Sequence, residues 1–204
     1  MRGGLRSFGM KASLAAAVAS IAYGIPQILQ VIGALHDPWD RVLIFAPSLL
    51  LAPCFVCAMA AAVELANPAR RAIARAAFGL SIMYAVLVSS VYIIQLTVVI
   101  PRELQGEVAQ MAWLKCCSPR MPLTGLDLLG YSLMSVALWL LAAALGKEQG
   151  KTLRLTLQVN GWLAFVILGQ VQWPSLIWPA AVWLLSFPLA MLLLRRRFAS
   201  AEVG

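Results

Sequence analysis

Charged residues are scarce in this chain of 204 amino acids, and their scarcity excludes most soluble folds. Only 12% of the residues are charged, whereas a soluble domain carries about 25%. Hydrophobic residues make up 62% of the chain, and the mean hydropathy is +0.85. Most of the surface must therefore face lipid. The sequence has room for one membrane domain and for no sizeable soluble one.

Familiar catalytic motifs are also missing from the sequence. It contains no Gly-rich phosphate loop, no His-Glu-x-x-His and no Ser/His/Asp set. The single histidine, His36, lies near Asp37 and Asp40, a pattern more typical of a solvated turn than of a metal site. The middles of the long apolar stretches carry no charge, which disfavours an ion-driven mechanism. We therefore expect no cofactor and no metal, and an enzymatic activity is disfavoured.

The net charge of +8 does not indicate nucleic-acid binding. The basic residues form short clusters between long uncharged runs, which is how a multi-span protein sets its orientation. A nucleic-acid surface needs a continuous basic face instead. The expected partner is the lipid bilayer, and no nucleic-acid partner is expected.

Six stretches are long and apolar enough to cross about 30 Å of hydrocarbon as helices. The last uncharged run is too long for one span and breaks at residues 170–175, where polar residues and Pro174 predict a turn. The sequence thus predicts an all-α integral membrane protein, a six-helix transmembrane bundle forming a single domain over residues 1–204. The expected spans are 12–35, 42–64, 76–100, 127–145, 155–172 and 175–194.

Lysine and arginine are concentrated on one side of these spans, which predicts that both termini are cytoplasmic. The apolar run of the first span continues to Leu35, which favours an uncleaved helix over a signal peptide. Alanine-rich spans and the preference for arginine over lysine indicate a bacterial protein, and hence a plasma (inner) membrane location. The side predicted as inner holds Arg2, Arg6, Lys11, Arg70, Arg71, Arg75, Lys147, Lys151, Arg154, Arg195, Arg196 and Arg197; the outer side holds Arg41, Arg102, Lys115 and Arg120.

One connection, residues 101–126, is long enough to form structure outside the membrane. Leu104, Val108 and Met111 recur in it at i, i+4 and i+7 with charges between them. This spacing predicts a short amphipathic helix on the outer membrane surface, between the third and fourth spans.

Polar side chains inside the spans follow helical spacing. The first span carries Tyr23, Gln27 and Gln30 on one face, and the third carries Tyr92 and Gln95 on one face. Prolines near these residues should kink the helices and open space between them. We therefore predict an outward-facing cavity. Its candidate ligand-binding residues are Tyr23, Gln27, Gln30, Tyr92, Gln95, Asp127, Tyr131 and Gln170.

The leading functional hypothesis is that this cavity binds or translocates a small neutral, partly apolar molecule. The same side chains also suit interhelical hydrogen bonds, and Asp127 also suits a helix cap. A non-catalytic accessory subunit of a larger membrane complex is therefore an alternative. A membrane-protein partner or a homo-oligomer would fit that alternative.

The four cysteines support a second alternative. Cys54 and Cys57 form a Cys-x-x-Cys after Pro53, and Cys116 and Cys117 are adjacent in the long connection. This arrangement resembles that of membrane thiol oxidases, in which a helix pair exchanges electrons with loop cysteines. Against it, Cys54 lies past the bilayer midplane, and no basic residue stands nearby to lower its thiol pKa. Packing of small apolar side chains is the competing interpretation.

Overall fold

A computed structural model of the chain describes residues 3–118, 120–146 and 149–200, and these residues form an all-helical bundle. Helices account for 86% of the structure, and the described residues contain no strand. Arg2 and Lys147, two of the basic residues used to predict the orientation, lie outside the described residues.

Six helices are long and apolar enough to cross a membrane, as the sequence predicts. The third continues without a break through a π-helical segment, η3 (Gln95–Val99), into the short helix α4 (Ile100–Leu104). The sixth is interrupted, because two residues separate the short helix α8 (Ile177–Ala180) from the long helix α9 (Trp183–Ser200). The principal helices are α1 (Gly3–Val31), α2 (Trp39–Ala62), α3 (Arg71–Ile94), α6 (Pro122–Ala144), α7 (Lys151–Gly169) and α9 (Trp183–Ser200).

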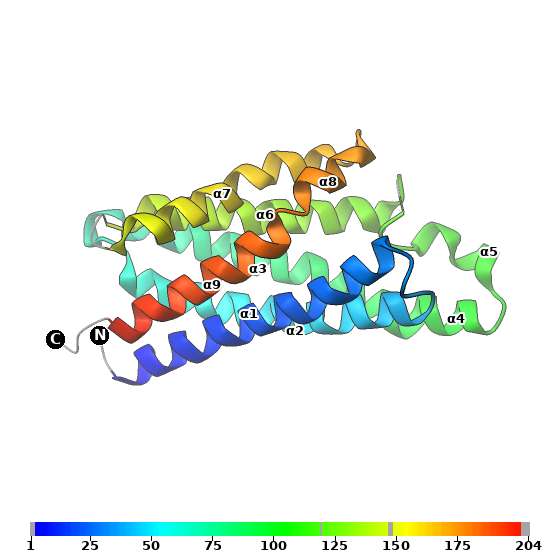
Figure 1. The fold of residues 1–204 in the computed structure, drawn as a ribbon, viewed down its shortest axis with the longest axis horizontal. Helices are drawn as coiled ribbons and strands as arrows, with labels where there is room; N and C mark the ends of the chain where they lie inside the picture. The colour runs from blue at the N-terminus through cyan, green and yellow to red at the C-terminus, as the bar shows by residue number, and fades with distance from the viewer. Residues whose placement is uncertain (1–2, 119, 147–148, 201–204) are drawn as a thin grey trace.

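The six helices close into a ring. Each packs against its neighbour in the chain: α1 on α2, α2 on α3, α3 on α6, α6 on α7 and α7 on α9. Helix α9 then packs against α1 and completes the circuit. The start of α1 and the end of α9 lie at the same end of the bundle (Figure 1). We call this the terminal end, and the opposite one, which carries residues 105–118 and 120–121, the loop end.

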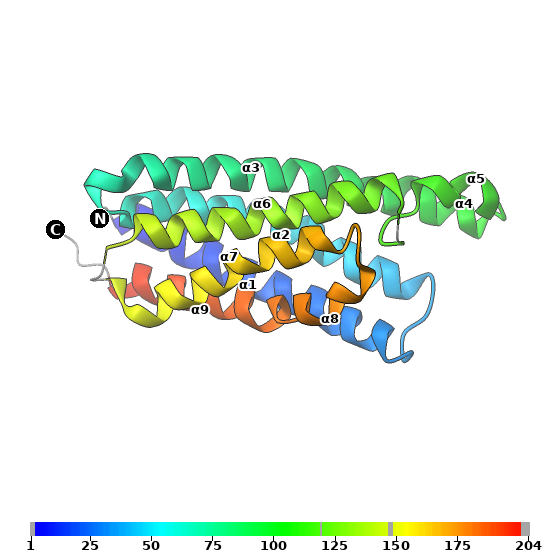
Figure 2. The ribbon, with the colours of Figure 1, turned by 90° about the horizontal axis from the view of Figure 1, so that it is seen from above.

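The connection at the loop end contains two short helical segments. Helix α4 ends at Leu104, a turn follows with Gly106 at φ 91°, and α5 (Val108–Met111) is one helical turn long. Leu104 and Val108 are exposed, whereas Met111 is buried. Figure 2 shows α4 and α5 projecting together beyond the other helices. The left-handed residue at Gly106 ends the helical path, because only glycine adopts that conformation readily.

Three prolines near the predicted cavity residues, Pro26, Pro47 and Pro53, all lie inside continuous helices. Close helix contact depends on small residues, as is usual in membrane bundles. A Cβ atom at Gly130 would lie 2.7 Å from Cγ1 of Val88, so α6 approaches α3 more closely than alanine allows. This approach brings the residue after Gly130, Tyr131, against the tyrosines of α3.

Candidate functional site

All four tyrosines of the chain meet inside the ring of helices. Tyr131 of α6 is in the middle, with its ring centroid 5.5 Å from that of Tyr84 on α3 and 6.5 Å from that of Tyr23 on α1. The hydroxyl of Tyr92, also on α3, donates to the hydroxyl of Tyr131 at 3.2 Å. Three helices thus contribute phenol groups to one cluster within an apolar bundle.

A tryptophan and three phenylalanines enclose these tyrosines. The ring of Trp183, the first residue of α9, lies edge-on to Tyr131 at 5.4 Å and stacks on Phe187 at 4.8 Å. Phe45 of α2 stacks on Tyr92, and Phe55, also of α2, meets the edge of Tyr84. The interruption between α8 and α9 ends immediately before Trp183. We call the four tyrosines and Trp183 the aromatic cluster.

Asp127 lies beside this cluster and does not cap its helix. Met121 occupies the N-cap position of α6 and makes no side-chain cap bond, and Asp127 follows more than a turn later. The capping interpretation of Asp127 is therefore wrong. Its carboxyl group lies beside the Tyr92 side chain, and the residue is 9% exposed. The helix places Asp127 four residues before Tyr131, so both side chains project from one face.

Three buried polar atoms at this site have no hydrogen-bond partner among the described residues. They are Oδ1 of Asp127, the hydroxyl of Tyr84 and Nε1 of Trp183. Buried polar groups are almost always paired in folded proteins, and leaving one unpaired costs about 1–3 kcal/mol. Inside a membrane bundle no bulk water is available to pair with such an atom, so this free-energy cost is not reduced. These atoms come from three different helices, α6, α3 and α9.

Gln95 binds the backbone of the loop-end connection through two hydrogen bonds. Its side chain is completely buried, and its amide group donates to the carbonyl of Leu114 at 2.8 Å. Its side-chain oxygen accepts from the backbone N–H of Cys116 at 3.0 Å. Gln95 opens the π-helical segment η3, and such segments are frequent at functional sites. The glutamine therefore binds the loop backbone rather than lining an open cavity.

This attachment brings two cysteines to Asp127. The sulfurs of Cys116 and Cys117 and a carboxylate oxygen of Asp127 all lie within 4.8 Å of one another. Cys116 is buried and Cys117 is exposed, and neither forms a disulfide. A hydrogen bond with Cys117 and burial together raise the pKa of the Cys116 thiol above its usual value. In the unliganded protein this thiol is therefore protonated at neutral pH and is a poor nucleophile.

The helix cysteines belong to a different part of the bundle. Cys54 and Cys57 are half-buried in the middle of α2, and both are free thiols. Cys54 lies fifteen residues after Trp39, or about 22 Å along the helix from its loop end at 1.5 Å per residue. The loop cysteines lie at the loop end, against the second turn of α6. Nothing in this arrangement supports electron exchange between the two pairs.

Two predicted glutamines form a separate chain of hydrogen bonds. The amide of Gln27 donates to Gln30 at 3.2 Å, and the amide of Gln30 donates to Oδ2 of Asp40 at 2.8 Å. These bonds join α1 to the start of α2. The polar residues predicted on one face of α1 therefore have two different environments. Tyr23 lies in the aromatic cluster, whereas Gln27 and Gln30 belong to this hydrogen-bonded series.

Beside it lies a buried ionic cluster. Arg41 is paired with Asp37 and with Glu103, each at 2.5 Å, and Lys115 reaches Glu103 at 3.4 Å. The side chains of Arg41 and Glu103 are only 8% and 7% exposed. The cluster connects α2 to α4 and to the long connection, so it holds the loop end together.

Gln170 lies apart from the other predicted site residues. It lines a hollow of about 250 Å³ at the loop end, between α6 and the end of α7. None of the other predicted site residues lines this hollow. Its lining is Arg120, Met121, Pro122, Thr124, Gly125, Leu128, Gln170 and Val171.

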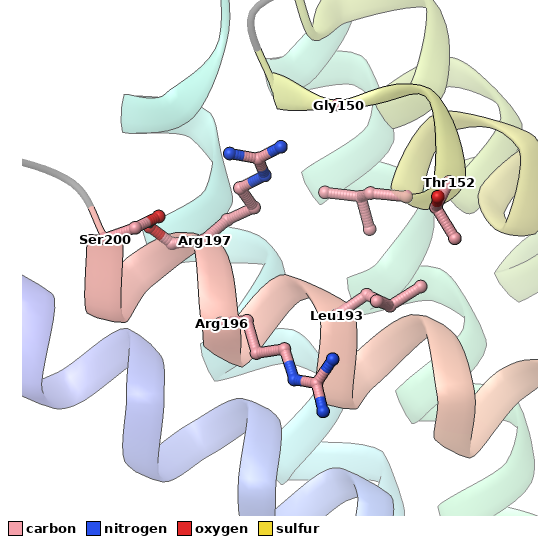
Figure 3. A pocket seen from close by; sticks show the side chains of 7 residues that line it. Gly150, Thr152, Leu193, Arg196, Arg197 and Ser200 are labelled. Carbon is pink, nitrogen blue, oxygen red and sulfur yellow. The ribbon is translucent and has the colours of Figure 1, made fainter.

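A second hollow, of about 310 Å³, lies at the terminal end between α7 and α9. Figure 3 shows Arg196 and Arg197 of α9 on one side of it and Thr152 of α7 on the other. Its basic lining belongs to the arginine-rich flank seen in the sequence. None of the predicted site residues contributes to it.

Sequence reasoning missed two members of the aromatic cluster, Tyr84 and Trp183. Tyr84 lies on the same helical face as Tyr92, so helical spacing is the signal that could have found it. Trp183 had no distinguishing signal among the tryptophans of the spans. Comparisons of the chain with protein-family models, with curated proteins and with solved structures found no significant match.

Proposed function

We propose that the chain binds a small uncharged, partly apolar molecule at the aromatic cluster, in the part of the bundle nearer the loop end. Its six apolar helices are consistent with a multi-pass membrane protein. One observation carries the proposal: three buried polar atoms of residues at this cluster, on three helices, have no hydrogen-bond partner among the described residues. A ligand that pairs with them would recover the free energy lost by leaving them unpaired.

The types of these atoms define the ligand. Nε1 of Trp183 can only donate, a carboxyl oxygen such as Oδ1 of Asp127 can accept, and the hydroxyl of Tyr84 can do either. A molecule with a donor and an acceptor close together, such as an amide or an alcohol, would satisfy all three. Its apolar part would contact the aromatic rings. Because the rings already touch one another, binding would require them to separate.

For orientation, we propose that the terminal end faces the cytoplasm and the loop end faces outward, in a bacterial plasma membrane. The support is the basic flank at the terminal end. In a background with all four native cysteines changed to serine, we expect Gln105→Cys to react with an impermeant thiol reagent in intact cells. Thr152→Cys should react only after lysis. The reverse pattern would contradict this orientation.

The function is tested by removing one unpaired hydroxyl. Tyr84→Phe deletes an atom without a partner, so the ligand-free protein should be unchanged or up to about 1 kcal/mol more stable. The same variant should retain less ligand. Native mass spectrometry of protein purified in mild detergent should show a stoichiometric small-molecule adduct in the wild type. The adduct should be reduced in Tyr84→Phe and in Asp127→Asn.

Tyr92→Phe is the matched control, because it removes a hydroxyl that does have a partner. It should cost about 0.5–1.5 kcal/mol of unfolding free energy. If Tyr84→Phe destabilises the protein as much as Tyr92→Phe does, the Tyr84 hydroxyl is not unpaired. If the wild type carries no adduct and yields no small molecule on organic extraction, the ligand-binding proposal fails.

An accessory-subunit role is favoured by one other feature, an aromatic patch on the outside of the ring. Trp139 of α6 packs against Trp162 of α7 with centroids 5.0 Å apart, and Phe165 adjoins both. Trp162 and Phe165 are each 62% exposed. A partner helix or a second copy of the chain would cover this patch, as would lipid. A stoichiometric subunit that co-purifies with the wild type and is lost from Trp162→Ala would support this role.

A further inference from the structure

The thiols of Cys116 and Cys117 and the carboxylate of Asp127 lie together at the loop end. Only Asp127 also belongs to the proposed ligand site. The ligand atoms of the three residues lie within 4.8 Å of one another. In a tetrahedral zinc site, with metal–sulfur bonds of about 2.3 Å, two sulfurs are about 3.8 Å apart. Shifts of about 1 Å would therefore bring these three groups onto one ion. Cys117 is exposed, so an ion can reach the group from the loop end.

The backbone is arranged to turn both thiols to one side. Neighbouring side chains in an extended segment point in opposite directions. Cys117 departs from this alternation, because its φ of 69° is in the left-handed region that residues other than glycine seldom adopt. Such strained residues persist where the surroundings hold them, and they cluster at functional sites. Gln95 fixes the residue before Cys117, because its side-chain oxygen accepts a hydrogen bond from the backbone N–H of Cys116.

A second observation at the same place indicates a missing ligand. Oδ1 of Asp127 is buried and has no hydrogen-bond partner within the described part of the chain. Asp127 is more than nine-tenths buried, and its carboxylate lies in the group with both sulfurs. A cation in this position would satisfy the carboxylate and be close to both sulfurs.

We propose that Cys116, Cys117 and Asp127 form a binding site for a thiophilic divalent metal ion of the zinc class. Two thiolates and one carboxylate are ligands that zinc accepts, whereas magnesium and calcium prefer oxygen alone. On binding, the metal replaces the thiol protons, which pass to solvent. Three protein ligands leave one coordination position for water or for an exchangeable ligand. The inference goes beyond the proposed function and shares only Asp127 with it.

Cadmium is a suitable probe, because its bonds to thiolates absorb in the ultraviolet. Reduced, chelator-treated protein in detergent should bind one Cd²⁺ per chain with a thiolate-to-metal charge-transfer band. Zn²⁺ should displace the Cd²⁺ and abolish the band, while excess Mg²⁺ should not. Isothermal titration with Zn²⁺ should give the same stoichiometry.

The chain supplies its own matched controls. Cys116→Ser and Cys117→Ser should each weaken Zn²⁺ binding by about a hundredfold or more, since losing even an outer-shell partner costs about 10–100-fold. Asp127→Asn, which keeps the size of the side chain, should weaken it to a similar extent. The double variant Cys54→Ser/Cys57→Ser should bind as the wild type does. Tyr84→Phe should also leave metal binding unchanged, which separates this site from the proposed ligand site.

Three results would overturn the proposal. The first is a charge-transfer band that survives in the Cys116→Ser/Cys117→Ser double variant. The second is wild-type affinity in Asp127→Asn, which would remove the carboxylate from the site. The third is a fully reduced wild-type protein that binds no Cd²⁺ or Zn²⁺ while its helical circular dichroism is intact.

Discussion

Replacing Arg41 with alanine should destabilise the protein by about 3–5 kcal/mol, because it leaves the buried carboxylate of Glu103 without its closest partner. Lys115 reaches the same carboxylate only at 3.4 Å, and its side chain is 34% exposed. The loss should be measured as unfolding free energy in detergent, from helical circular dichroism during denaturant titration.

Two further variants test the cause of this loss. Arg102→Ala removes an arginine whose pair with Glu107 is exposed, with side-chain exposures of 55% and 39%. It should cost no more than about 1 kcal/mol. Adding Glu103→Gln to Arg41→Ala removes the stranded charge and should recover part of the stability. A double variant as unstable as the sum of both single variants would contradict this explanation.

Truncating Tyr131 to alanine should have the second-largest effect, a loss of about 3 kcal/mol. Its ring contacts those of Tyr23, Tyr84 and Trp183, so truncation opens a cavity in the centre of the ring of helices. Large-to-small core substitutions of aromatic residues cost about 3–5 kcal/mol in soluble proteins. The lower end applies here, because lipid is as apolar as the bundle interior and packing supplies most of the stabilisation.

Tyr131→Phe separates packing from hydrogen bonding at this position. It keeps the ring and loses only the bond from Tyr92, so it should cost about 0.5–1.5 kcal/mol. The same unfolding measurement applies to both variants. If phenylalanine and alanine destabilise the protein equally, the hydroxyl network rather than the ring packing holds the centre together.

The stripe of polar residues on the third span illustrates what sequence spacing can predict. The side chains of Tyr92 and Gln95 both face the interior, as helical spacing indicates. Their roles differ, because Tyr92 bonds to Tyr131 while Gln95 binds the backbone of the loop. The role of Gln95 depends on the path of residues 112–116 in the folded chain. Helical spacing within the third span does not predict that path.

The predicted cavity residues divide for a similar reason. Tyr23, Tyr92, Asp127 and Tyr131 come together, whereas Gln27 and Gln30 bond to each other and to Asp40. Gln170 lies at another face of the loop end. The order of the six apolar helices along the chain was predictable from the sequence. The rotation of each helix about its axis, and the neighbour it faces, were not.

The all-helical architecture and the six apolar helices were determined by the sequence alone. Lipid requires each crossing to be apolar over about 20 residues and to satisfy its own backbone hydrogen bonds. Both requirements are local along the chain, so composition reveals them. The grouping of Cys116, Cys117 and Asp127 was decided only by tertiary structure. It depends on the buried amide of Gln95, the left-handed backbone of Cys117 and the close approach of α6 to α3, which join parts of the chain distant in sequence.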